Sequence, residues 1–189
     1  MDTVNVVLCG LGGQGILFMT RVLARAALEK GFNVMGAETH GMAQRGGSVV
    51  SHLRFGEVSG SLVRVDSAHF LLALDEIEAY RNLPFLARGG RMYVNTGSPG
   101  FPREEVRDFL ARRKIIARSL PAAHVAEERG APLSSNLALL GFFSAFDEGP
   151  ISRDEMRATI ERISPERSRE TNLGIFDAGY DKAKGEGNG

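Results

Sequence analysis

Hydrophobic residues in the first 37 positions follow first the pattern of a strand and then the spacing of a helix. Residues 5–9 form a short apolar, β-branched run that ends in glycines, which predicts a strand followed by a tight loop. Apolar residues then recur at helical spacing at Ile16, Met19, Leu23, Ala26 and Ala27. Gly31 closes this helix with a left-handed cap, and residues 33–37 form a second strand. We therefore expect a βαβ unit with a right-handed crossover and a sheet that begins with parallel strands.

Further along the chain, the pattern predicts more strands and then a helical region. The expected strands are residues 48–55, 70–74, 91–95 and 114–119, with helices from 75 to about 82 and from about 104 to 110. Residues 135–146 are apolar on nearly all sides, and two apolar stripes follow, at Met156, Ile160 and Ile163 and at Leu173, Phe176 and Tyr180. We expect the helix at residues 135–146 to pack in the core of the domain, although such a face could also serve a subunit interface.

The fold class is thus α/β: a three-layer sandwich with a mostly parallel, Rossmann-like sheet and a helical C-terminal third. No linker or repeat divides the chain, so residues 1–183 are expected to form a single domain. Residues 184–189 (KGEGNG) offer no apolar surface to offset the entropy of ordering, which predicts a disordered tail.

A glycine loop follows the first predicted strand. Gly10, Gly12 and Gly15 form the pattern G-x-G-x-x-G at the start of a helix, and Gly13 loosens the loop further. Free backbone N–H groups and the positive end of a helix attract phosphate or carboxylate there. The alternative is that these glycines only let strand and helix pack closely. Glu38, near the end of the second strand, also makes an independent NAD-binding or nucleotide-binding module admissible.

Composition and charge narrow the function classes. The chain has 189 residues, with 23 Lys plus Arg and 23 Asp plus Glu, so net charge favours neither nucleic acid nor an anionic membrane. Its one cysteine, Cys9, cannot supply the thiolates of an iron–sulfur cluster, and we find no metal-ligand pattern. The N-terminus lacks a basic region before its short apolar run, which predicts a cytoplasmic protein.

The polar segment at residues 38–47 (ETHGMAQRGG) makes the sequence recognisable as a family member. GLGGQGI at 10–16, followed by AETHGMAQRGGSVVSHLRFG at 37–56, resembles the gamma-type subunits of 2-oxoacid:ferredoxin oxidoreductases, which include the pyruvate and ketoisovalerate enzymes. Within that family, the resemblance is closest to the small (beta) subunit of the indolepyruvate type. It covers the chain from the first strand to about Tyr180.

The resemblance implies a non-autonomous enzyme subunit. A larger partner would bind thiamine diphosphate, Mg and [4Fe-4S] clusters, decarboxylate an aryl 2-oxo acid, and pass electrons to ferredoxin while coenzyme A (CoA) takes the acyl group. This chain would bind no cofactor alone and would help form the CoA side of the active site. A homodimer of the isolated chain stays open, as does a scaffold role in which the glycine loop binds nothing.

By the same resemblance, the ligand-binding candidates lie in two segments: Gly10, Gly12, Gly13, Gln14 and Gly15, then Glu38, His40, Gln44, Arg45, Gly46 and Gly47. Arg45 would contact a phosphate or carboxylate through its planar fork, and His40 or Gln44 would hydrogen-bond the ligand or the partner. The alternative for Arg45 is a structural pair with Glu38. We assign no catalytic residue, and we interpret His52 as a strand residue with a satisfied hydrogen bond.

Overall fold

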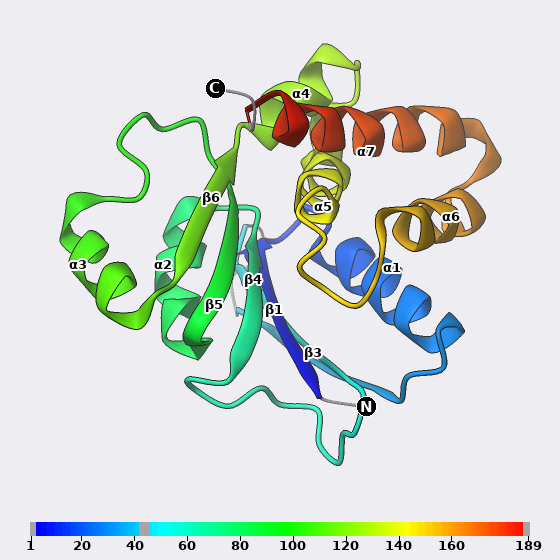
Figure 1. Cartoon of the computed structure of the whole chain (residues 1–189). Helices are drawn as coiled ribbons and strands as arrows, with labels where there is room; N and C mark the ends of the chain where they lie inside the picture. The colour runs from blue at the N-terminus through cyan, green and yellow to red at the C-terminus, as the bar shows by residue number, and fades with distance from the viewer. Residues whose placement is uncertain (1–2, 42–45, 187–189) are drawn as a thin grey trace.

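A six-stranded sheet runs through the middle of the molecule, with helices on both faces (Figure 1). The computed structural model describes residues 3–41 and 46–186 of the chain. In chain order the strands are β1 (Val4–Leu11), β2 (Val34–His40), β3 (Ser48–Phe55), β4 (Ala68–Ala73), β5 (Leu86–Asn95) and β6 (Ile116–Leu120). The three-layer α/β architecture expected from the hydrophobic pattern is confirmed.

One antiparallel strand is inserted near one end of an otherwise parallel sheet. The order is β2-β3-β1-β4-β5-β6, with β3 antiparallel to both of its neighbours and β4, β5 and β6 parallel to β1 in turn. The mostly parallel sheet is confirmed, and β1 and β2 run in the same direction as expected of the βαβ unit, but β3 lies between them. Leu53 and Phe55 of β3 are buried in the core, whereas most of β2 is exposed, so β3 takes the inner position.

Helices divide into two groups according to the sheet face that they cover (Figure 1). On one face lie α2 (Glu76–Asn82) and α3 (Glu104–Arg113), and on the other lie α1 (Ile16–Glu29), α4 (Ala122–Glu128), α5 (Ser135–Ser144), α6 (Arg153–Ile163) and α7 (Glu166–Glu186). Helix α4 was not predicted. The sequence predicted a disordered tail from Lys184, whereas α7 continues to Glu186. No helix in the described part of the chain is long and apolar enough to cross a bilayer.

Helix α5 lies at the centre of the larger core. All of its residues are buried, as its uniformly apolar sequence predicted. It packs between the sheet and α7, which lies on its outer side (Figure 1). The prediction of a core helix is therefore confirmed.

Two glycines let α5 and α7 cross at backbone contact. A Cβ atom on Gly141 of α5 would lie 1.9 Å from the Phe176 carbonyl oxygen, and one on Gly179 of α7 would lie 2.0 Å from the Ala138 carbonyl oxygen. Both distances are far inside van der Waals contact, so neither position has room for a side chain. This crossing fixes the distance between the two helices.

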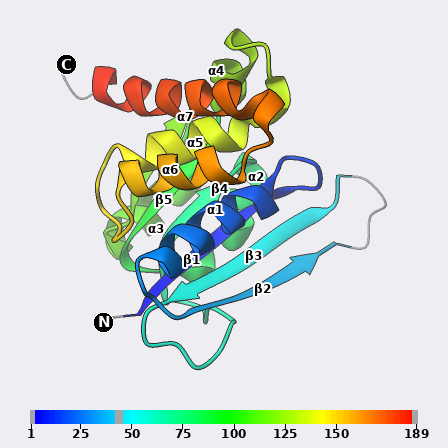
Figure 2. The same cartoon turned by 90° about the vertical axis from the view of Figure 1, so that its right-hand side faces the viewer.

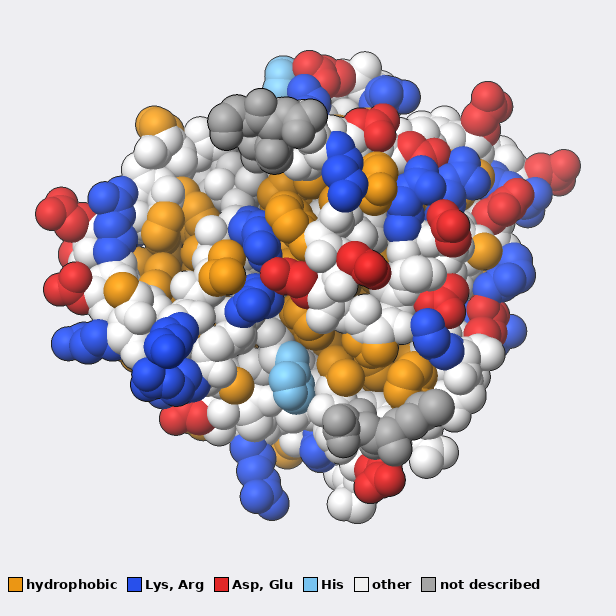
Figure 3. Space-filling view, viewed as in Figure 1, with side chains coloured by type: hydrophobic (Ala, Val, Ile, Leu, Met, Phe, Trp, Pro, Cys, Tyr) orange, Lys and Arg blue, Asp and Glu red, His pale blue; other side chains and the backbone are white. Residues whose placement is uncertain are grey.

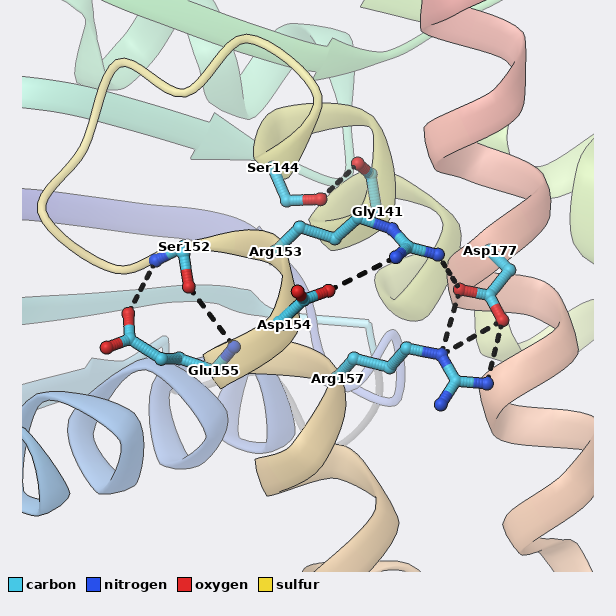
Figure 4. Close-up of polar contacts among 8 residues, drawn as sticks. All are labelled: Gly141, Ser144, Ser152, Arg153, Asp154, Glu155, Arg157 and Asp177. Carbon is cyan, nitrogen blue, oxygen red and sulfur yellow. Dashed lines mark hydrogen bonds and ion pairs between the residues drawn. The ribbon is translucent and has the colours of Figure 1, made fainter.

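Polar contacts form the start of α6 and join α6 to α7 (Figure 4). Ser152 and Glu155 form a capping box at the start of α6, in which the Glu155 N–H donates to Ser152 Oγ and the Ser152 N–H donates to Glu155 Oε2. Arg153 and Arg157 of α6 both donate to Asp177 of α7, at 2.7 Å and 3.0 Å. These contacts set the angle between α6 and α7.

We expect Gly141→Ala to lower the free energy of unfolding by about 3 kcal/mol or more, because the added methyl group overlaps the α7 backbone and forces the helices apart. Urea denaturation measures the change. Gly174→Ala in α7 is the matched control: its Cβ would meet only Arg129 Nη1, at 3.6 Å. Gly174→Ala should leave stability unchanged or raise it slightly through helix propensity. Equal effects at both positions would refute the backbone-contact explanation.

Candidate functional site

The glycine loop forms the junction between β1 and α1, as the sequence predicted. Gly10 still belongs to β1, Gly12 and Gly13 form the turn, and Gly15 precedes α1 with φ 86°, a left-handed conformation that favours glycine. A Cβ on Gly15 would lie 2.5 Å from Asn136 Nδ2 of α5. Gly15 is therefore required for packing as well as for the turn, and part of the motif has a structural role.

Gln14 holds the loop in place with its side chain. Its Oε1 accepts a hydrogen bond from the Leu11 N–H at 2.7 Å, and its Nε2 donates to the Leu74 carbonyl at 3.3 Å. These contacts connect the loop to its own strand and to the end of β4. The sequence singled out Gln14 as a ligand contact, and the geometry gives it a positioning role in the loop.

The glycine loop meets the residues just before β3 at one edge of the sheet. The Gly12 N–H donates to the Gly47 carbonyl at 2.9 Å, and the Gly41 N–H donates to the Ser48 carbonyl at 2.7 Å. This edge is where β1 and β4 end, and Figure 2 shows the loop after β1 on the same side as the end of β2. Ligands bind at such carboxyl edges in open α/β sheets.

Unpaired donors remain in the loop. Within residues 3–41 and 46–186, no acceptor is found for the backbone N–H groups of Gly13, Gly15, Ile16 and Leu17. The first N–H groups of a helix lack intrahelical partners and carry partial positive charge. No carboxylate lies in the first turn of α1 to neutralise them. The loop is thus suited to a phosphate or carboxylate group.

Glu38 and His40 lie in β2, not in a loop as the sequence predicted. His40 pairs with Val49 and Glu38 with Ser51, so both side chains are on the α1 face of the sheet, and both are exposed. β3 separates them from β1 by two strand spacings, about 10 Å. Gly46 and Gly47 lie at the start of β3, beside Gly12. Gln44 and Arg45 lie outside the described residues.

A buried contact at the base of this segment was missed from the sequence. Ser48 Oγ donates to Glu78 Oε2 of α2 at 2.6 Å, and Arg81 pairs with the same carboxylate at 2.6 Å. Glu78 is 1% exposed. The contact anchors the residue next to Gly47 to a helix on the opposite face. Nothing in the local pattern of either residue indicates it, because the two are thirty residues apart.

His52 is a structural residue, as predicted. It is buried in β3, its Nδ1 accepts the Val63 N–H at 3.3 Å, and its ring meets Phe85 edge to face. Burial lowers the pKa of His52 below its ordinary value. Burial, followed by the charges of Glu78 and Asp75, raises the pKa of the Cys9 thiol well above its usual range. Both groups are buried, and His52 Nδ1 already accepts a hydrogen bond, so neither is available as a base or nucleophile in this structure.

Comparison with protein families gives one match over almost the whole chain. The family model described as pyruvate ferredoxin/flavodoxin oxidoreductase matches residues 5–182. A curated relative, the indolepyruvate oxidoreductase subunit IorB of Methanothermobacter thermautotrophicus, is 33% identical over 95% of this chain and 97% of its own length.

Solved structures share the fold. The gamma subunit of a keto/oxoacid ferredoxin oxidoreductase from Geobacter sulfurreducens superposes with a TM-score of 0.74 at 21% identity, covering 96% of this chain and 99% of that one. The 2-oxoglutarate:ferredoxin oxidoreductase of Magnetococcus marinus, solved with 2-oxoglutarate, coenzyme A and succinyl-CoA bound, has a TM-score of 0.78 at 21% identity. The match covers 98% of this chain and 32% of that longer polypeptide.

We expect Ser48→Ala to lower the free energy of unfolding by about 1–3 kcal/mol, because the buried Glu78 carboxylate loses a donor. The Gly12 amide should also exchange faster, since its acceptor at Gly47 is no longer anchored. Native-state hydrogen exchange measures both effects. Ser98→Ala is the control, because no partner for the exposed Ser98 hydroxyl is found in the described chain. Unchanged exchange at Gly12 would contradict the anchoring role.

Proposed function

The chain belongs to the pyruvate ferredoxin/flavodoxin oxidoreductase family, and from this membership we propose that it is the small subunit of a thiamine-dependent 2-oxoacid:ferredoxin oxidoreductase. The proposed substrate class is indolepyruvate and related aryl 2-oxo acids. The match to an indolepyruvate oxidoreductase subunit of nearly the same length supports both the substrate class and a separate subunit. The chain acts in this proposal as part of an assembly.

In the overall reaction, the 2-oxo acid loses CO₂ and an electron pair passes to ferredoxin. The acyl carbon bonds to the thiol sulfur of CoA, which gives up its proton. An iron–sulfur cluster does not fit this chain, because its single cysteine is buried and such clusters take four thiolates. Within residues 3–41 and 46–186, no three His, Cys, Asp or Glu side chains group as metal ligands. We therefore assign thiamine diphosphate, Mg and the clusters to a larger partner subunit, which also contacts ferredoxin.

The observation that carries the proposal is the hydrogen bond from Gly12 to Gly47. It brings the donors at the start of α1 together with the segment that gives the family its most specific sequence, at the edge of the sheet where ligands bind. Backbone N–H groups of Gly13, Gly15 and Ile16 would hold a phosphate group of CoA. CoA, when bound, supplies the thiol that accepts the acyl group.

The side chains around the glycine loop have different proposed roles. His40 and Glu38 face the same side as α1 and are exposed, so they are available to the ligand or to the partner subunit. Arg45, a ligand candidate from the sequence, would add a fixed positive charge with a planar fork. Gln14 keeps the loop in shape through its contacts with Leu11 and Leu74. The proposed location of the assembly is the cytoplasm.

An independent NAD-binding module is not favoured. In a dinucleotide-binding fold, the acid that holds the ribose follows the strand next to β1. Here β3 occupies that place and runs in the opposite direction, so Glu38 lies one strand further out. The family model, which matches residues 5–182 and so includes the glycine loop, supports the oxidoreductase subunit instead.

The purified chain should show no 2-oxoacid oxidation, and activity should appear when it is assembled with the proposed thiamine-bearing partner subunit. The reason is that the chain cannot hold the clusters that carry electrons. Reduction of ferredoxin by indolepyruvate, with CoA present, is the measurement. Aryl-specific activity from the isolated chain would overturn the proposal, as would full activity of the partner without this chain.

Arg45→Ala should raise the KM for CoA at least tenfold in the assembled enzyme and leave the KM for the 2-oxo acid within about twofold, because one charge-assisted hydrogen bond to the CoA anion is lost. Arg45→Lys should recover part of the loss, since it restores the charge without the fork. Arg167→Ala, on an exposed position of α7, is the control for loss of one charge. An unchanged KM for CoA would remove Arg45 from the site.

A further inference from the structure

A hollow lies at the opposite edge of the sheet from the glycine loop. Its volume is about 200 Å³, and it opens where β4 and β5 begin. His69, Arg88, Arg91 and Glu148 supply its polar side chains. Since β1, β4 and β5 are parallel, the starts of β4 and β5 and the end of β1 are at opposite edges. This hollow is therefore separate from the candidate active site.

The backbone at the start of β5 shapes the hollow. Gly89 has φ 77°, and a Cβ on Gly90 would lie 2.9 Å from Leu86 Cδ2 and 3.0 Å from the Ala87 carbonyl oxygen. The pairing with β4 shifts register between Ala68 and Phe70 at the same place. Such a bulge re-aims neighbouring side chains. Here the irregular backbone places Arg88 and Arg91 on the rim of one depression.

Glu148 has no acceptor capacity left for a ligand. Its Oε1 accepts from Arg91 Nε at 3.0 Å and from Arg118 Nη2 at 3.1 Å. Its Oε2 accepts from Arg118 Nη1 at 2.9 Å and from the hydroxyl of the buried Tyr93. Four donors occupy the sites that a carboxylate offers. Glu148 therefore fixes the arginines in place and does not itself present an acceptor to the hollow.

The remaining polar side chains of the hollow are donors. Nδ1 of His69 accepts the Asn5 N–H at 3.0 Å, so the proton of the neutral imidazole is on Nε2, which becomes a donor. Arg88 is exposed and has no hydrogen-bond or ion-pair partner anywhere in the described chain. Nη2 of Arg91 also makes no hydrogen bond to a described residue. Three side chains that line one small volume thus carry N–H groups without a described acceptor.

The net charge of the side chains around the hollow is positive, which favours an anion as the donors do. Arg91 and Arg118 both pair with Glu148, and the exposed Arg88 lines the same hollow as Glu148, so three arginines accompany one carboxylate and positive charge is in excess. Figure 3 shows basic and acidic side chains intermixed on the face that it presents, and the formal net charge of the whole chain is zero, so the excess is local to this cluster. A confined positive field attracts small anions.

We propose that this hollow is a second anion site, which binds an oxyanion of phosphate or carboxylate chemistry through Arg88, Arg91 and His69. The volume accommodates a single phosphate or carboxylate group with bound water, not a nucleotide. The planar guanidinium of Arg88 matches such a group in a bidentate geometry. The source of the anion is either a diffusible small molecule or an acidic side chain of a bound subunit.

Titration of the full chain with inorganic phosphate, at constant ionic strength set with chloride, tests the site. Nuclear magnetic resonance should show saturable shifts of the Gly89 and Gly90 amides and of the His69 ring. Arg88→Ala should weaken phosphate binding about tenfold, the effect of losing one charge-assisted hydrogen bond. His69→Ala should weaken it less. Arg112→Ala, an exposed arginine of α3, controls for net charge and should have no effect.

Two outcomes would overturn the proposal: no saturable shift at these residues, or equal phosphate affinity in Arg88→Ala and the unsubstituted chain. A second arm uses the assembled complex to identify the source of the anion. Retained phosphate binding there assigns the site to a diffusible oxyanion. Phosphate binding to the free chain only, with weaker subunit association in Arg88→Glu, assigns it to a carboxylate of the partner. Neither result depends on oxidoreductase activity, so the site and the proposed function fail separately.

Discussion

The insertion of β3 between β1 and β2 is the constraint on which the functional end of the molecule depends. Because β3 is antiparallel to both neighbours, its first residue, Ser48, lies at the edge where β1 and β2 end. Gly46 and Gly47, just before β3, therefore lie beside the glycine loop, and the Gly47 carbonyl accepts the Gly12 N–H. A direct β1–β2 pair would have put Glu38 next to β1, as in a dinucleotide-binding fold.

Packing of the helical layer fixes the position of the glycine loop. Asn136, at the start of α5, donates to the Gly15 carbonyl at 3.3 Å and fills the space where a side chain on Gly15 would lie. The other end of α5 is fixed by backbone contact with α7 through Gly141. The position of the loop that would bind an anion is thus set by core packing. A preorganised loop loses little entropy when a ligand binds.

The two proposed anion sites, at opposite edges of the sheet, rest on different kinds of donor. At the carboxyl edge the donors are backbone N–H groups at a helix start, whose partial charges come from the peptide units themselves. At the opposite edge the donors are side chains, and a single carboxylate, Glu148, holds two of the arginines in place. A chain with zero net charge can hold both arrangements, because each field is confined to a few groups within a Debye length.

The sequence by itself determined the features that depend on neighbouring residues. The strand, glycine loop and helix at the N-terminus, the alternation that buries His52, the all-apolar α5 and the family motif at 37–56 could all be recognised from spacing and residue type. Only the tertiary structure decided the inner position of β3, the Ser48–Glu78 contact and the donor-lined hollow at Arg88. These features join segments far apart in the chain. Their formation depends on which surfaces compete for burial, and a local period carries no information about that competition.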